Sequence, residues 1–165
     1  MRSLSSAKRE FKDVWIVLND YSGSRQGNFE LNILEIEGMK QEISANILLD
    51  SLQQNGSIAL YINFETGKSS IQPESQPIID QLVEMLKTEA SIKISIEGHT
   101  DNIGTAAANL VLSQNRAKAV MDAIIAKGID KTRLSSKRWG QGKPVADNST
   151  DDGKARNRRV EIVKQ

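Results

Sequence analysis

The chain contains 165 residues, enough for one domain with a buried core, with or without an extension. Hydrophobic residues make up 38% and charged residues 26% of the sequence, a composition typical of soluble globular proteins, and no apolar run approaches the roughly 20 residues of a membrane span. The net charge is +1, the absence of cysteine excludes disulfides and thiolate metal sites, and one histidine is too few for a His-rich site, so no metal or cofactor is expected.

The first part of the chain predicts a flexible lead-in and two strands. Residues 1–12 are polar and charged, as is common at frayed chain ends. The apolar run Val14–Leu18 predicts a short strand, and the alternating residues 29–36 predict a second one. The Gly- and Ser-rich residues 21–28 predict a turn between them.

A helix is expected next, because apolar residues recur at helical spacing and Gly56 stands where a helix would end. These apolar residues are Met39, Ile43, Ile47, Leu48 and Leu52. Two strands and one helix over residues 13–56 form a ββα extension too small to bury such a stripe. We therefore expect this extension to pack against the domain that follows it.

Residues 57–165 predict strands and helices in the order β-α-β-α-β-β. In chain order, the expected elements cover residues 57–64, 78–86, 92–97, 106–127, 133–139 and 158–163. A Gly98 loop follows the third element, and a Gly-, Pro- and Asn-rich connection over residues 140–153 precedes the last. This alternation predicts an α/β fold, an α+β sandwich of a mixed sheet with helices on one face.

Asp101 and Arg116 are the first candidates for a binding site. They lie fifteen residues apart around the start of the expected helix over residues 106–127. A guanidinium fork holds a carboxylate through two hydrogen bonds, and the N–H groups and positive dipole end at a helix start also favour a carboxylate. A site with one acid and one base suits a zwitterion with an ammonium and a carboxylate on one carbon.

Taken singly, these residues also have ordinary structural explanations. An Asp in a loop commonly accepts backbone N–H groups, and an Arg within a helix is commonly solvated. His99, between Gly98 and Thr100, is expected to be a hydrogen-bonding loop or core residue and not a metal ligand.

Three spaced blocks carry a resemblance to a known family. They read Gly98-His99-Thr100-Asp101-x-x-Gly104, then Asn109-x-x-Leu112-Ser113-x-x-Arg116-Ala117, then Asn157-Arg158-Arg159-Val160. In this order and spacing the chain resembles the OmpA-like (OmpA C-terminal, MotB and Pal type) peptidoglycan-binding domain from about residue 57 to the C-terminus. The resemblance implies the same β-α-β-α-β-β fold.

The resemblance also implies a ligand and its contacts. Asp101 would take the ammonium and Arg116 the carboxylate of diaminopimelate in the peptide stem of peptidoglycan, whereas a lysine at that stem position lacks the carboxylate. The implied peptidoglycan-binding residues are Asp101, Arg116, Asn109, Thr100, Arg158, Ile103, Asn157 and Ser70. The loop from Phe64 to Ser70 would lie beside the pocket, with Ser70 where related chains often carry Asn. Leu112 and Ala117 are expected in the core, and Arg159 on the face of its strand opposite Arg158.

A cellular role follows from the same resemblance. It implies non-covalent, non-catalytic anchoring of an outer-membrane or periplasmic protein to the cell wall, as a monomer or weak dimer. Residues 1–6 contain no apolar signal segment, so the periplasmic localisation rests on the resemblance alone.

Alternative functions have less support in the residues. A stator- or secretion-associated wall anchor would share the binding chemistry, and a protein-interaction domain without the ligand would not need the Asp101 and Arg116 pair. A hydrolytic enzyme lacks a motif: Gly67-Lys68-Ser69 has Ile62 where a phosphate-binding loop needs glycine, and His99 with Asp101 has no nucleophile elbow. Residues 98–165 carry thirteen Lys and Arg against seven Asp and Glu, but their only tight basic cluster has no interleaved aromatics, so nucleic acid is not an expected partner.

Overall fold

The computed structural model describes the strands over residues 14–20 and 29–35 and the whole of residues 43–165. The chain divides into two compact units, residues 1–41 and 42–165. In the first unit, β1 (Val14–Asp20) and β2 (Phe29–Glu35) pair antiparallel, with Ile16 opposite Ile33. The expected flexible lead-in, residues 1–12, and the turn, residues 21–28, lie outside the described residues.

The helix expected near the N-terminus belongs to the second unit. α1 (Ala45–Asn55) begins after Ser44, whose hydroxyl accepts the Ile47 N–H at 3.4 Å, and ends at Gly56 in the left-handed conformation. Leu48 and Leu52 are fully buried in the core of residues 42–165, so the structure divides after residue 41 and not at the expected residue 56. Met39, expected in this helix, lies outside the described residues.

The second unit contains the mixed sheet that the sequence predicted. Its strands are β3 (Ser57–Leu60), β4 (Ile94–His99), β5 (Leu134–Gly140) and β6 (Val160–Lys164). The strand order is β3-β6-β4-β5, in which β6 runs antiparallel to both neighbours and β4 runs parallel to β5. β4 is therefore central, and its C-terminal end leads into the loop that carries Thr100 and Asp101.

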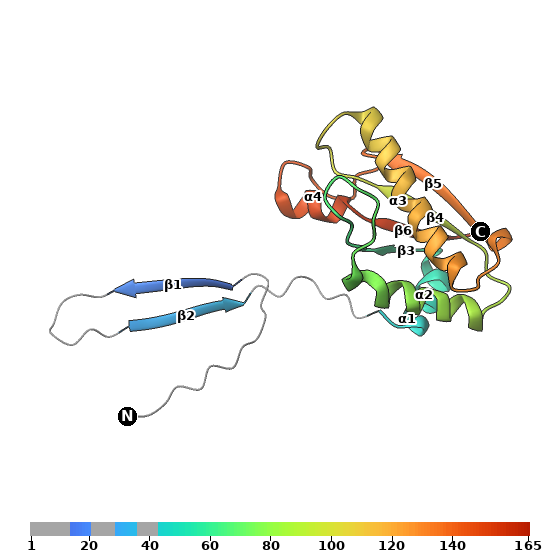
Figure 1. Ribbon diagram of the computed structural model, residues 1–165, viewed down its shortest axis with the longest axis horizontal. Helices are drawn as coiled ribbons and strands as arrows, with labels where there is room; N and C mark the ends of the chain where they lie inside the picture. The colour runs from blue at the N-terminus through green and yellow to red at the C-terminus, as the bar shows by residue number, and fades with distance from the viewer. Residues whose placement is uncertain (1–13, 21–28, 36–42) are drawn as a thin grey trace, which may run out of the picture. The chain divides into compact units, whose positions relative to one another are not determined.

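Helices cover one face of this sheet (Figure 1). α2 (Gln76–Thr88) follows a 3-10 turn that starts at Pro73, and α3 (Ala106–Ala126) starts after Thr105, whose hydroxyl accepts the Ala108 N–H at 3.2 Å. The core lies between α1, α2 and α3 and the apolar face of the sheet, where Ile94, Ile96 and Ile162 are fully buried. A second 3-10 turn, Lys131–Arg133, precedes β5.

The connection expected over residues 140–153 contains the start of a helix that the sequence did not reveal. α4 (Asp151–Asn157) begins after Thr150, whose hydroxyl accepts the Gly153 N–H at 3.0 Å. A Cβ at Gly153 would lie 1.8 Å from the Asp147 carbonyl oxygen, so this glycine permits close packing and does not mark a loop. Because α4 extends to Asn157, the last strand begins at Val160 and not at residue 158.

A second glycine brings α3 against the centre of the sheet. Gly98 was expected to open a loop but lies inside β4, and a Cβ there would be 2.1 Å from the Ser113 carbonyl oxygen. The Ser113 hydroxyl accepts the Gly140 N–H at 3.0 Å, which ties α3 to the end of β5 as well. This close approach places the N-terminal half of α3 directly over the end of β4.

Candidate functional site

The loop after β4 is held in shape by Thr100 and Asn109. The Thr100 N–H donates to the Gly140 carbonyl at 2.9 Å, and the Thr100 hydroxyl donates to the Asp101 carbonyl at 2.8 Å. The Asn109 amide, reaching from α3, donates to the carbonyls of Asp101 at 3.2 Å and Ile103 at 3.1 Å. Both polar side chains are buried and bond the loop itself, so they determine where the Asp101 carboxylate lies.

The Asp101 carboxylate has two partners in this structure. Its Oδ1 accepts the Ile103 N–H at 3.1 Å, and its Oδ2 lies 2.8 Å from Nη1 of Arg158. Arg158 follows α4 immediately and precedes β6, so the closing segment of the chain brings it to the β4–α3 loop. The resemblance implied Arg158 as a binding residue, and the ion pair brings it next to Asp101.

Arg116 is held by the loop over residues 64–71. Its Nε donates to the Lys68 carbonyl at 3.1 Å, and its guanidinium carbon lies 4.9 Å from the centre of the Phe64 ring. The loop closes on itself through a bridge between Phe64 and Ile71. Within the described residues, Nη1 and Nη2 of Arg116 make no hydrogen bond or ion pair, so the fork of the guanidinium is oriented while its two terminal nitrogens keep their donors available.

The charges of Asp101, Arg116 and Arg158 act on one another. Burial lowers the pKa of Arg116, the Asp101 carboxylate raises it, and the nearby Arg158 lowers it again. The guanidinium remains charged at neutral pH because an arginine does not lose its proton in a protein. One acidic and two basic groups therefore offer partners both to an ammonium and to a carboxylate, with one positive charge in excess.

Three further predicted residues lie at or near this site in different ways. Ile103 is at the loop and 63% exposed, so its apolar side chain is available to a ligand. Ser70 is exposed, and its carbonyl accepts the Glu65 N–H at 3.0 Å within the loop over residues 64–71. Asn157 is fully buried, and its amide makes four hydrogen bonds to residues 145–148, which supports the segment before Arg158 instead of facing solvent.

Phe64 and the Lys68 carbonyl were not identified as site groups from the sequence. The expected position of their loop beside the pocket is consistent with the contacts to Arg116, but no sequence signal marks a backbone carbonyl as a partner. Arg158 and Arg159 both precede β6, so they do not lie on opposite faces of that strand as expected. Arg159 contacts other groups than Arg158 does, pairing with Glu161 at 2.6 Å and donating to the Lys143 carbonyl at 3.2 Å.

The stacking of Arg116 on Phe64 leads to a testable expectation. In the variant Phe64→Leu the guanidinium loses the aromatic ring while an apolar side chain still fills the position. We expect carboxylate ligands to bind about two- to tenfold more weakly, since cation–π contacts contribute roughly 0.5–1 kcal/mol at exposed sites and more when desolvated. Calorimetric titration checks this, with Phe29→Leu as a control outside residues 42–165; equal affinity of Phe64→Leu and wild type would contradict it.

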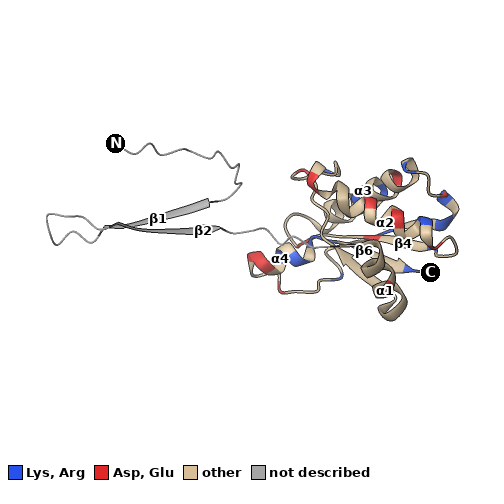
Figure 2. Ribbon diagram, turned by 90° about the horizontal axis from the view of Figure 1, so that it is seen from below, with Lys and Arg blue, Asp and Glu red and all other residues tan. Residues whose placement is uncertain are grey.

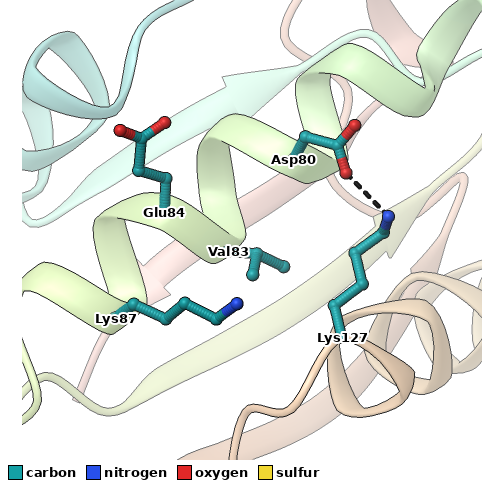
Figure 3. A pocket seen from close by; sticks show the side chains of 5 residues that line it. All are labelled: Asp80, Val83, Glu84, Lys87 and Lys127. Atoms are coloured by element: carbon teal, nitrogen blue, oxygen red, sulfur yellow. Dashed lines mark ion pairs between the residues drawn. The ribbon is translucent and has the colours of Figure 1, made fainter.

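A shallow pocket elsewhere has a different character. It has a volume of about 430 Å³ and is lined by Val83 and by charged residues of α2 with Lys127, which follows α3 (Figure 3). Lys127 and Asp80 pair across it at 2.7 Å. The pocket contains none of the predicted site residues. More generally, acidic and basic positions are interspersed over residues 42–165 (Figure 2).

Comparison with known proteins finds relatives that are named for the outer membrane or for peptidoglycan. A model of the OmpA family matches residues 63–158. Outer membrane porin F of Pseudomonas aeruginosa is 39% identical over 105 residues, which cover 63% of this chain and 30% of porin F. Peptidoglycan-binding protein ArfA of Mycobacterium tuberculosis is 36% identical over 102 residues, which cover 62% of this chain and 31% of ArfA. The chain spans between about a third and a half of the length of the first curated relatives that it matches.

A solved structure has the same fold. The peptidoglycan-associated lipoprotein from Burkholderia pseudomallei superposes with a TM-score of 0.58 and 33% sequence identity, covering 65% of this chain and 89% of that one. In the part of this chain that the structure describes, the helices are too short or too polar to cross a membrane.

Proposed function

This chain belongs to the OmpA family, as its spaced motifs predicted, and we propose that it binds peptidoglycan through the diaminopimelate of the peptide stem. The binding is non-covalent and non-catalytic, and it anchors a periplasmic or outer-membrane protein to the cell wall. Two relatives, peptidoglycan-binding protein ArfA and the peptidoglycan-associated lipoprotein, are named for peptidoglycan, which supports this polymer as the ligand. Outer membrane porin F is named for the outer membrane, which supports an association with that membrane.

The observation that carries this proposal is the arrangement around Arg116. Its guanidinium is oriented by Phe64 and the Lys68 carbonyl, its terminal nitrogens are available, and burial makes an unpaired charge there unfavourable. A bound carboxylate supplies the missing partner through two parallel hydrogen bonds. Asp101, on the other side of the α3 start, then receives the ammonium of the same amino-acid head.

Arg158 is the partner of Asp101 while no ligand is bound. At 2.8 Å it neutralises the carboxylate, and with 46% of its side chain exposed it is able to move aside or to share Asp101 with an ammonium. Its charge also reinforces that of Arg116 toward the ligand carboxylate. Thr100 and Asn109 act by holding the loop in this geometry, Ile103 covers the ligand from the loop, and Asn157 and the loop of Ser70 support the two arginines.

Free amino acids test the ligand. Because a lysine within the peptide stem has no carboxylate beside its side-chain ammonium, the matched comparison is a lysine derivative with blocked α-amino and α-carboxyl groups, Nα-acetyl-lysinamide. We expect meso-diaminopimelate to bind measurably and more tightly than this derivative, with part of the difference reflecting an unpaired Arg116. In two-dimensional NMR titrations, the shifts should cluster at residues 100–104, Asn109, Arg116 and Arg158. Equal affinity for meso-diaminopimelate and the blocked lysine derivative, or shifts confined to the pocket of Asp80 and Lys127, would contradict the proposal.

Whole cell-wall sacculi test the polymer and the absence of catalysis together. The full chain should co-sediment with purified diaminopimelate-type peptidoglycan, bind the lysine type more weakly, and release no soluble fragments detectable by mass spectrometry. Release of muropeptides would favour the hydrolytic alternative instead.

A further inference from the structure

A second cluster of ionisable groups lies on the polar face of the sheet, away from α1, α2 and α3. Glu97 of β4 stands directly opposite Glu161 of β6 in the antiparallel pairing, and His99 lies two residues further along β4. Glu97 and His99 are buried, with 6% and 1% of their surface exposed. One oxygen of each carboxylate and one ring nitrogen of His99 all lie within 4.8 Å of one another.

His99 is incompletely satisfied in this position. Neither ring nitrogen has a hydrogen-bond partner among the described residues, and Nε2 lies 3.6 Å from Oε2 of Glu161. Burial, followed by the positive charge of Arg159, lowers the pKa of His99 to about 4. The neutral imidazole ring has one nitrogen lone pair, and both ring nitrogens of His99 are buried. A buried polar group without a partner costs free energy, so its retention calls for an explanation.

The carboxylates already have cationic neighbours. Arg159 pairs with Oε1 of Glu161 at 2.6 Å, and Lys137 of β5 lies 3.3 Å from Oε1 of Glu97. The Trp139 indole N–H donates to the other oxygen of Glu97, and the Ser95 hydroxyl donates to Oε1 at 3.3 Å. Lys137 is the exchangeable member of this set because about half of its side chain is exposed, whereas that of Arg159 is almost wholly buried.

We propose that Glu97, His99 and Glu161 form a binding site for a divalent transition-metal ion, with Zn²⁺ as the representative ligand. One imidazole and two carboxylates supply three protein ligands, and water completes the coordination. In a tetrahedral zinc site with bonds of about 2.1 Å, ligand atoms are separated by roughly 3.4 Å, so the widest separation in the cluster needs to shorten by up to about 1.4 Å. The pair His99 and Glu161, at 3.6 Å, already has nearly this separation.

Charge balance determines how the ion enters. In the absence of the metal ion, Lys137 and Arg159 neutralise the two carboxylates. When the dication binds, it neutralises Glu97 in place of Lys137, and the Lys137 ammonium moves into solvent. Lys137 therefore competes with the metal for Glu97, while Arg159 stays on Glu161 and Lys143. This competition distinguishes a metal site from a purely structural polar network, because a network loses stability when Lys137 is removed and gains no metal affinity.

The experiment is a Zn²⁺ titration of the full, untagged chain at pH 7, followed by calorimetry and by NMR of the imidazole. His99 is the single histidine of the sequence, so its ring signals are assigned without ambiguity. We expect Zn²⁺ to shift these signals and the variant Glu161→Gln to bind at least about tenfold more weakly, since even outer-shell changes at metal sites cost 10–100-fold. Lys137→Met should bind more tightly than wild type, and Lys118→Met, which removes an equal charge on α3, should bind like wild type.

Each other outcome overturns the proposal. Unshifted His99 signals, or wild-type affinity in Glu161→Gln, would place any bound Zn²⁺ elsewhere. Affinity in Lys137→Met no higher than that of Lys118→Met would show that the ammonium and the metal do not compete for Glu97. Unfolding midpoints measured in the presence of EDTA establish that each variant is folded before titration. If Glu161→Gln is unfolded, the comparison of Lys137→Met with Lys118→Met tests the proposal instead.

Discussion

Replacing Arg116 by alanine is expected to lower the affinity for diaminopimelate-type peptidoglycan by roughly 30-fold or more, because losing one partner of a desolvated charge contact costs about 2–5 kcal/mol. The fold should remain intact, since Arg116 lies within α3 and alanine is the better helix former. Sedimentation with purified sacculi and calorimetry with meso-diaminopimelate measure the effect.

Two variants show what kind of contact is lost. Arg116→Lys keeps the charge but presents no planar fork, so it should recover only part of the affinity. Arg138→Ala removes an exposed arginine of β5 and should bind like wild type, which controls for the change in net charge. Full recovery by lysine would mean that the ligand carboxylate meets a point charge, and equal losses in Arg116→Ala and Arg138→Ala would mean that only the overall charge matters.

Replacing Gly98 by alanine is expected to destabilise the chain by about 3 kcal/mol or more. The added Cβ would lie 2.1 Å from the Ser113 carbonyl oxygen, and both atoms belong to backbone elements, so β4 and α3 must separate. Overpacking typically lowers the free energy of unfolding by about 1–3 kcal/mol. A clash with a main-chain atom, which cannot rotate away, is expected to cost at least the upper value of that range.

Chemical denaturation measures this loss, with Gly67→Ala as the matched control. A Cβ at Gly67 meets nothing within 4 Å, so its cost of about 1 kcal/mol comes from the positive φ alone. Because α3 carries Asn109 and Arg116, folded Gly98→Ala protein should also bind diaminopimelate more weakly. Similar unfolding free energies for the two variants would show that α3 shifts away from β4 at little cost.

The apolar pattern of the sequence was sufficient for most of the fold. Strict alternation through Ile92, Ile94 and Ile96 and the helical spacing of Val120 and Ile124 depend only on neighbouring residues, and both patterns led to elements that the structure contains. α4 was missed because its stability depends on capping by Thr150 and on tight packing at Gly153, and both residues also occur commonly in loops. The seven residues of α4 are also too few to show a helical periodicity of apolar residues.

The candidate site also contains groups that the sequence could predict and groups that it could not. Asp101 and Arg116 were predicted because their charges and their spacing match the motif of the family that the sequence resembles. The groups that orient Arg116 could not be predicted, since one is a backbone carbonyl and the other a phenylalanine that reads as an ordinary strand residue. Glu97 and Glu161 are 64 positions apart and meet only through the pairing of β4 with β6. The expectation of no metal site was based on the numbers of cysteines and histidines, which carry no information on the sheet register.

The order of the strands affects whether two copies of this chain can associate through the edges of their sheets. In the described residues, β5 and β3 are the outer strands of the sheet, and an outer strand is able to recruit a strand from a neighbouring molecule. β3 has only four residues, and β5 carries the adjacent exposed cations Lys137 and Arg138, so a second copy would bring the same charges to this strand. Two copies held close together therefore repel one another at β5 and have little strand length to pair with at β3.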